Sequence, residues 1–361
     1  YIEGLTDLSV EAAKELAQWK GSNLYLNGLR ELSVEVAKEL AQWKGINLYL
    51  NGLSELSVEV AKELAQFSSD LSLRGLYLYL NGLYLNGLTK LSVEVAKELA
   101  QFKGSKVSLN GLTSLSVEVA KELAQSNSDP SLNGLTSLSV EVAKELAQFK
   151  GSEVSLNGLT SLSVEVAKEL AQFKGFIAKV SLNGLTSLSV EVAKELAKWK
   201  GHILTLNGLS ELSVEASREL AQSNSNLSLN GLTSLSVEVA KELAQFKGYF
   251  LSLSGLTELS VEAARELAQW GEEDNELYLN GLTKLSVEVA KELAQFKGYS
   301  LSLNGLTDYG LSVEAARELA QWKGSNLYLI GLTDLSVEVA KELAQSNSDL
   351  YLDGLSELGR E

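Results

Sequence analysis

The stretch Leu32-Ser33-Val34-Glu35-Val36-Ala37-Lys38-Glu39-Leu40-Ala41-Gln42 determines the fold, because close variants of this eleven-residue phrase occur fourteen times in the 361-residue chain. Successive copies start 23 to 26 residues apart, except for one step of 35. A unit this short must bury its apolar side against its neighbours, so the period predicts a repeat array. The copies begin at Leu8, Leu32, Leu56, Leu91, Leu115, Leu138, Leu162, Leu188, Leu212, Leu235, Leu259, Leu285, Leu311 and Leu335.

A second motif precedes each phrase and is typified by Leu24-Tyr25-Leu26-Asn27-Gly28-Leu29. It alternates apolar with polar residues and then reaches a glycine, which indicates a short strand followed by a turn. The predicted unit is therefore a strand, a tight turn, a helix and a loop in about 24 residues.

The phrase itself is predicted to be a helix. Ser33 is placed as the N-cap and Glu35 lies in the first turn, where the helix dipole favours a carboxylate. The apolar residues of the phrase and Trp43 follow at the spacing of one helical stripe, and the charged residues take the other side. We expect Gly45 to end the helix in the left-handed conformation. The equivalent residues are Gly104, Gly151, Gly175, Gly248, Gly298 and Gly324.

So short a unit leaves no room for an antiparallel return, so successive strands should lie parallel and in register with the helices behind them. Strands need about 4.8 Å and helices about 8 to 10 Å of spacing, which predicts a curved solenoid with the sheet on the concave face and the helices on the convex face. We expect one α/β repeat domain over residues 1–361, with decayed units at 1–7 and 350–361 and an irregular insertion at 74–88.

Together these motifs resemble the leucine-rich repeat. The run Leu-x-Leu-Asn-Gly-Leu-Thr-x-Leu-Ser followed by Ala-x-x-Leu-Ala is similar to the cysteine-containing subclass of F-box substrate receptors, here as a bacterial-like tandem array. The match covers nearly the whole chain, at Leu24, Leu26, Gly28, Leu32 and Ser33 in a typical unit, while Leu29 stands where the family has Cys or Asn. The resemblance implies that another group bonds the turn backbone. We expect the helix-capping serines to share this role with Thr113, Thr136, Thr160, Thr186 and Thr233.

Composition bounds the class of protein. No apolar run approaches 18 residues, so no membrane span is predicted. The net charge is −16, and each phrase contributes two glutamates and one Lys or Arg, so the charge is expected on the solvated helix side. Nucleic-acid binding is not expected, because phosphate contact needs clustered basic residues. The chain lacks cysteine and begins without Met, so we treat it as a fragment of open localisation.

With Leu24 and Leu26 pointing inward, the residues between and after them form two columns on the concave sheet. The first column is predicted to contain Tyr25, Tyr49, Ser72, Ser108, Ser131, Ser155, Ser181, Thr205, Ser228, Ser252, Tyr278, Ser302, Tyr328 and Tyr351. The second is mostly asparagine, with Arg74, Ser254, Ile330 and Asp353 as exceptions. Tyrosine thus gathers towards both ends of the array.

Tyrosine offers rigid apolar area with a polar tip, which suits contacts to proteins or sugars. The candidate ligand-binding residues are Tyr25, Tyr49, Tyr79, Tyr278, Tyr328, Tyr351, Asn27, Asn51, Asn110, Asn157, Asn183, Asn207 and Asn280. The alternative is that Tyr and Ser are ordinary surface-strand residues and that Asn recurs through duplication of the unit.

The long step contains repeated strand motifs with no helix between them, from Arg74 to Leu88. Either this segment loops outward, or Leu78 to Leu80 takes the strand position and the preceding residues bulge. As a functional insert it would present Tyr77, Tyr79 and Tyr84.

Two further features are interpreted as structural. Ser126, Ser223 and Ser346 replace the aromatic residue after the helix and begin Asn-Ser turns, which we interpret as shortened polar turns and not as calcium sites. The single histidine, His202, has no second ligand nearby in the sequence, so no metal site or cofactor is expected.

An enzyme is not expected, because the sequence shows no nucleophile with a base, and its paired carboxylates recur on every helix. Two functions remain. The first is a recognition scaffold that binds a protein or glycan on the concave face. The second is a passive spacer that sets length or rigidity within a larger protein.

Overall fold

The computed structural model describes residues 4–68, 81–173, 179–271, 273–355 and 357–358. Contacts divide the chain into two units, residues 1–184 with 200–202 and residues 185–199 with 203–361. The expectation of one repeat domain over residues 1–361 stays a prediction. No helix of the described residues is long and apolar enough to cross a bilayer.

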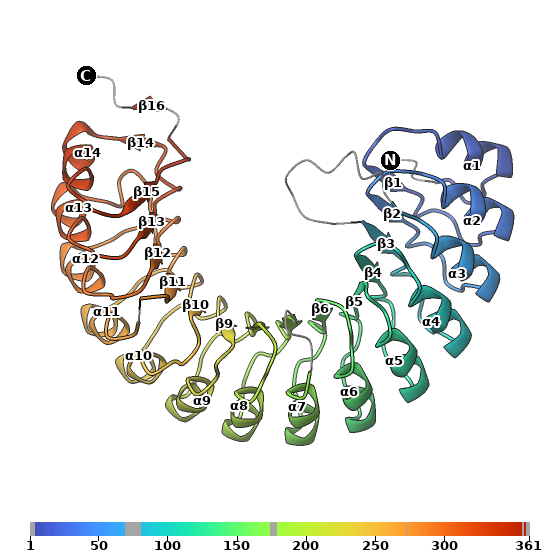
Figure 1. The fold of residues 1–361 in the computed structure, drawn as a ribbon, viewed down its shortest axis with the longest axis horizontal. Coiled ribbons are helices and arrows are strands. Elements are labelled where there is room, and N and C mark those ends of the chain that lie inside the picture. Colours follow the sequence, from blue (N-terminus) through green and yellow to red (C-terminus); the bar gives the residue numbers. More distant parts are fainter. Residues whose placement is uncertain (1–3, 69–80, 174–178, 272, 356, 359–361) are drawn as a thin grey trace. The chain divides into compact units, whose positions relative to one another are not determined.

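In the first unit, helices and strands alternate along the chain (Figure 1). The helices are α1 (Val10–Leu16), α2 (Val34–Leu40), α3 (Val58–Leu64), α4 (Val93–Leu99), α5 (Val117–Leu123), α6 (Val140–Leu146) and α7 (Val164–Leu170). The strands are β1 (Asn23–Tyr25), β2 (Asn47–Tyr49), β3 (Gly82–Tyr84), β4 (Lys106–Ser108), β5 (Asp129–Ser131), β6 (Glu153–Ser155) and β7 (Lys179–Ser181).

The second unit repeats this order. Its helices are α8 (Val190–Leu196), α9 (Val214–Leu220), α10 (Val237–Leu243), α11 (Val261–Leu267), α12 (Val287–Leu293), α13 (Val313–Leu319) and α14 (Val337–Leu343). Its strands are β8 (Ile203–Thr205), β9 (Asn226–Ser228), β10 (Phe250–Ser252), β11 (Glu276–Tyr278), β12 (Ser300–Ser302), β13 (Asn326–Tyr328) and β15 (Asp349–Tyr351), and β14 (Asp334–Leu335) pairs separately with β16 (Glu357–Leu358).

Within each unit the main strands pair parallel, in chain order and in register, as predicted. Leu24 lies opposite Leu48, and Leu48 opposite Leu83. The helices form a second layer along one side of the sheet (Figure 1). Since helices need more lateral room than strands, the sheet takes the concave side of each unit. The fold is a leucine-rich-repeat solenoid.

The core lies between the two layers and follows the predicted stripe. In α2, Val36, Ala37 and Leu40 are buried, and so are Trp43 after the helix and Leu26 from the strand motif. The helix begins as expected, because the Ser33 side chain accepts a hydrogen bond from the backbone N–H of Val36. Every described helix has this serine cap.

The prediction for the helix C-terminus is wrong. Among the described residues, only Gly4 and Gly271 have positive φ, so Gly45 and its described equivalents are not left-handed caps. The helix instead tightens after Leu40, and Trp43 N–H donates to the Leu40 carbonyl at 3.1 Å. Glycine is required at position 45 for a different reason. A Cβ there would lie 1.9 Å from the Trp43 ring, which is fully buried.

The shortened serine turns are confirmed, and they explain how an aromatic residue can be absent. In three repeats the indole Nε1 of a tryptophan donates to the carbonyl of the equivalent aromatic residue in the repeat before it, as Trp43 does to Trp19 at 2.9 Å. In the first serine turn, the Ser128 hydroxyl bonds the Phe102 carbonyl at 3.0 Å instead. Ser225 does the same to the Trp199 carbonyl at 2.9 Å, so in these two turns a hydroxyl replaces the indole donor.

The strand position of the long step is also corrected. It is occupied by β3, with Leu83 in register between Leu48 and Val107, and not by Leu78 to Leu80. Consequently Tyr84 and Asn86 take the column positions that were assigned to Ser72 and Arg74. Those two residues, with Tyr77 and Tyr79, lie outside the described residues.

Candidate functional site

The inner face of each unit is the sheet surface that carries the first and third residues of every main strand and the residue two positions after the third. The alternation that creates it is confirmed. Leu24 and Leu26 are buried, while Tyr25 between them is partly exposed. The first strand residues, such as Asn23, also face this side. They were missed as a third column, although the same period of two would have found them.

The asparagines of the inner face form a hydrogen-bonded ladder. The side-chain Oδ1 of each asparagine accepts a hydrogen bond from the backbone N–H at the same position of the next repeat. Asn133 Oδ1, for example, accepts from the Asn157 N–H at 2.8 Å. The ladder contains Asn27, Asn51, Asn86, Asn110, Asn133, Asn157 and Asn183 in the first unit, and Asn207, Asn230, Asn280 and Asn304 in the second.

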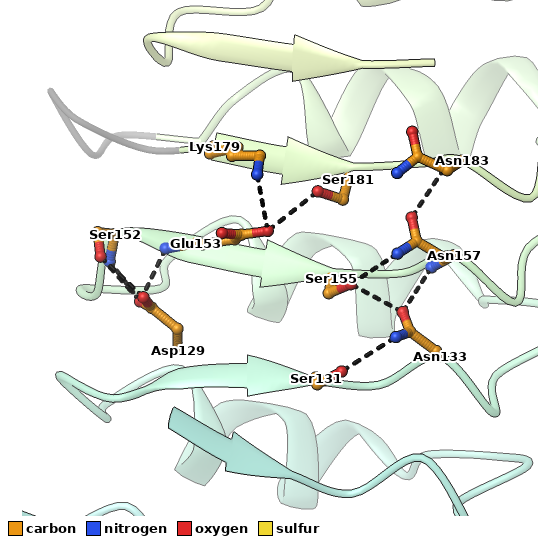
Figure 2. Close-up of polar contacts among 10 residues, drawn as sticks. All are labelled: Asp129, Ser131, Asn133, Ser152, Glu153, Ser155, Asn157, Lys179, Ser181 and Asn183. Carbon is orange, nitrogen blue, oxygen red and sulfur yellow. Dashed lines mark hydrogen bonds and ion pairs between the residues drawn. The ribbon is translucent and has the colours of Figure 1, made fainter. Parts of the chain in front are cut away.

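Column serines complete this network. Ser155 donates to Asn133 Oδ1 at 2.8 Å and accepts from Asn157 Nδ2 at 2.9 Å (Figure 2). Most serines of the column are buried, including Ser108, Ser131 and Ser302. The middle of the inner face in the first unit is therefore occupied by groups that bond each other.

This ladder corrects the expectation about the turn backbone. Thr113, Thr136, Thr160, Thr186 and Thr233 are all exposed and make no side-chain hydrogen bonds among the described residues. The asparagine oxygens bond the backbone after each strand, and the capping serines accept from their own helices. A buried backbone N–H needs an acceptor, and the side chain of the asparagine one repeat away supplies that acceptor.

The tyrosines of the first unit stack on one another. The ring centroids of Tyr25 and Tyr49 lie 4.3 Å apart at 13°, and those of Tyr49 and Tyr84 lie 4.2 Å apart at 15°. All three rings are partly exposed. In-register strands about 4.8 Å apart impose this stacking distance. The result is a three-ring aromatic surface over β1, β2 and β3.

Next along the first unit, the inner face is charged. Asp129 accepts from the N–H and hydroxyl of Ser152 and from the N–H of Glu153, and Lys179 pairs with Glu153 at 3.2 Å (Figure 2). Burial raises the pKa of Asp129, although these hydrogen bonds oppose the shift. Sequence reasoning missed this group because it belongs to the first-residue column.

In the second unit the aromatic residues sit on β10, β11, β13 and β15. The rings of Tyr328 and Tyr351 stack at 4.2 Å, and those of Phe250 and Tyr278 lie 4.8 Å apart at 48°. Tyr278 also donates to Glu276 at 3.3 Å. Burial and then the negative charge of Glu276 raise the pKa of Tyr278 to about 12. Phe250 and Glu276 were not predicted as part of the face.

Other candidates add no second site. Among the residues that the structure describes, no three His, Asp or Glu side chains gather as metal ligands. His202 is exposed and precedes β8. Glu35 and Lys38, on the outer side of α2, are solvated as predicted. Of the predicted site residues, the structure stacks Tyr25 on Tyr49 and Tyr328 on Tyr351, places Tyr278 against Phe250, and places the asparagines in the ladder. Tyr79 lies outside the described residues.

The sequence matches no described protein family and no curated protein. Solved structures of similar architecture include the TLR13–ssRNA13 complex, at 19% identity and TM-score 0.49, covering 93% of this chain and 55% of that one. An internalin (inlF) from Listeria monocytogenes aligns at 16% identity and TM-score 0.41, covering 99% of this chain and 92% of that one. Yeast Rad7 in complex with Elc1 aligns at 16% and 0.42, covering 90% and 89%. These likenesses concern the fold alone.

Proposed function

We propose that the chain is a recognition scaffold that binds a protein partner through the tyrosine clusters of its inner faces, Tyr25, Tyr49 and Tyr84 in the first unit and Tyr278, Tyr328 and Tyr351 in the second. A glycan is the alternative ligand. We also propose that the subclass resembled is the cysteine-containing leucine-rich repeat, and that the chain is not an enzyme.

One observation carries this proposal. Five of the six rings stack on a neighbouring tyrosine, Tyr278 lies tilted against Phe250, and all six are partly exposed, whereas asparagines and serines of the same face form the hydrogen-bonded ladder. A stacked ring loses little side-chain entropy when a partner covers it, and it presents a large apolar area with a polar edge. The tyrosines are thus better suited to contact a ligand than the asparagines.

A protein ligand is preferred over nucleic acid on electrostatic grounds. The inner faces carry the carboxylates Asp129, Glu153 and Glu276 beside the two strand lysines Lys106 and Lys179. Phosphate binding requires clustered Lys and Arg, and Lys179 is already paired with Glu153.

The rival function is a passive spacer. It is favoured by the asparagine ladder, because a ladder that bonds only itself needs no ligand to explain its recurrence. Under the spacer hypothesis, the tyrosines would also serve only to stabilise the sheet by stacking on one another.

A pull-down with the immobilised chain separates the two functions. We expect Tyr25→Ser/Tyr49→Ser/Tyr84→Ser and Tyr278→Ser/Tyr328→Ser/Tyr351→Ser each to lose proteins that the wild type retains. The matched control replaces three exposed tyrosines outside the strands, Tyr249, Tyr299 and Tyr309, with serine. A spacer predicts that all three triple variants retain the same proteins as the wild type.

A further inference from the structure

A carboxylate lies among aromatic rings on the inner face of the second unit. Glu276 and Tyr278 are the first and third residues of β11, and Phe250 begins the adjacent strand β10 in register with Glu276. The Phe250 and Tyr278 rings lie 4.8 Å apart, and the Tyr278 hydroxyl donates to Glu276 Oε2 at 3.3 Å. Glu276 is only partly buried, so one side of its carboxylate faces solvent.

Tyr328 lies on the side of Tyr278 that is opposite to Phe250. It stands two strands from Tyr278, and Ser302, at the same position of the strand between them, is fully buried. Burial, and after it the charges of Glu276 and Tyr328, raise the pKa of Tyr278, so these groups share one electrostatic environment.

Glu276 lacks the cation that its counterpart has. At the equivalent first position of β6, Glu153 pairs with Lys179 at 3.2 Å. Glu276 makes no ion pair among the described residues, and β8 to β13 and β15 contain no Lys or Arg. A partly desolvated carboxylate without a cation is a site of charge complementarity for a positive ligand.

We infer that Phe250, Glu276, Tyr278 and Tyr328 bind a cationic side chain, specifically an arginine guanidinium in a basic segment of the protein partner. This inference rests on the proposed recognition function and specifies its ligand chemistry. The guanidinium can bond the Glu276 carboxylate while its planar face lies against the aromatic rings. Arginine fits better than lysine, since only the guanidinium can both stack and donate in a fork.

The test uses a labelled peptide of alternating Gly and Arg, and its twin in which every Arg is citrulline, which keeps the shape and removes the charge. Fluorescence anisotropy measures their affinities for the full chain. We expect the wild type to prefer the Arg peptide, and Glu276→Gln to weaken that binding about fivefold to tenfold, which corresponds to about 1 to 1.4 kcal/mol and lies within the range of one net hydrogen bond at a partly exposed site. Tyr278→Phe keeps the ring and should lose less than Tyr278→Ser.

The matched control is Glu153→Gln, which changes the net charge equally at a carboxylate that already has a cation. It should alter Arg-peptide affinity by less than about twofold. Equal losses in Glu276→Gln and Glu153→Gln would overturn the inference, because only general attraction to an acidic chain would remain. Equal binding of the citrulline peptide would also overturn it. Circular dichroism should show that all variants fold as the wild type does.

These results are separable from those of the pull-down. If the tyrosine triple variants lose their partner while Glu276→Gln has no effect on peptide binding, the ligand chemistry is wrong and the recognition function stands. If the tyrosine variants also retain every partner, both are wrong.

Discussion

At the scale of single residues, repetition on this surface has a structural cause that differs from residue to residue. The asparagine recurs because its Oδ1 is the acceptor for a backbone N–H in the adjacent repeat. The tyrosines instead pack against neighbouring rings, and at the described column positions they are Tyr25, Tyr49 and Tyr84 in the first unit and Tyr278, Tyr328 and Tyr351 in the second. The two columns thus have different roles although they alternate along the same strands.

Asn133 offers a direct test of the ladder. It accepts from Asn157 N–H and the Ser155 hydroxyl, both at 2.8 Å, and donates to Ser131 at 3.0 Å. Asn133→Ala should lower the free energy of unfolding by about 1 to 3 kcal/mol, because the N–H is left without a partner. Urea denaturation measures this. Thr136→Ala, at an exposed neighbour, should stay within about 0.5 kcal/mol of wild type.

Gly151 tests the reason for glycine after the helix. An added Cβ would lie 2.3 Å from the buried Phe149 ring. Gly151→Ala should therefore destabilise by about 1 to 3 kcal/mol through overpacking. In a double-mutant cycle, Phe149→Leu should cost less in the alanine background than in wild type. Additive effects would contradict the steric explanation.

Tyr278 should give a measurable pH dependence. Its folded pKa of about 12 lies above the ordinary 10.0. A raised folded pKa means that the stabilisation is complete below about pH 10 and is lost as the pH rises through about 12. The free energy of unfolding should thus fall less steeply with pH, between about pH 10 and 12, for Tyr278→Phe than for the wild type. Glu276→Gln should lower the pKa of Tyr278 in an ultraviolet titration, because it removes the nearby negative charge. Identical curves for all three proteins would contradict this account.

At the scale of elements, the helix is specified at its start more strongly than at its end. Each described helix begins at a serine cap and has a glutamate in its first turn, as at Ser163 and Glu165 in α7. Each is only seven residues long, too short to be stable alone, so the cap and the packing against neighbours both matter.

We expect Ser163→Ala to lower the free energy of unfolding by about 1 kcal/mol, because the Val166 N–H loses its acceptor. Ser163→Asp should retain most of the stability, since aspartate also caps. The control is Ser161→Ala, at an exposed serine just before the helix. Thermal unfolding followed by circular dichroism would measure all three, and equal losses at positions 161 and 163 would refute the role of the cap.

Much of each element was predictable because local signals agree. The strand alternation, the serine cap and the Val36–Ala37–Leu40 stripe are repeated in nearly every unit, so the parallel, in-register sheet follows from the sequence. The conformation of Gly45 was not predictable, because composition cannot distinguish a left-handed residue from one that must leave room for the Trp43 ring.

The candidate site was predicted only in part, for a similar reason. Tyr25, Tyr49, Tyr278, Tyr328 and Tyr351 could be placed on the concave face from the alternation alone. The position of Tyr84 depended on which of three similar motifs pairs with β2, and pairing is a long-range choice. The bonds of the asparagine ladder link residues about one unit apart, so they became visible only with the strands side by side.

At the scale of the whole molecule, each unit has one face that is solvated and charged and one that carries the tyrosine clusters. The helix side holds the glutamates and the Lys or Arg of every phrase, and cross-helix pairs such as Arg317 with Glu342 at 2.8 Å are exposed and contribute little. The central claim is that partners are recognised on the inner face and not on this outer side.

Site-specific photo-crosslinking tests that claim most directly, since the chain has no cysteine. A benzophenone is attached to Lys106→Cys, on the inner face opposite Gly82 of the strand that carries Tyr84, or to Lys97→Cys, exposed on α4 of the same unit. With the proteins that the wild type retains in the pull-down, we predict crosslinks from position 106 and almost none from position 97. Crosslinks from position 97 alone, or equally from both, would contradict the account.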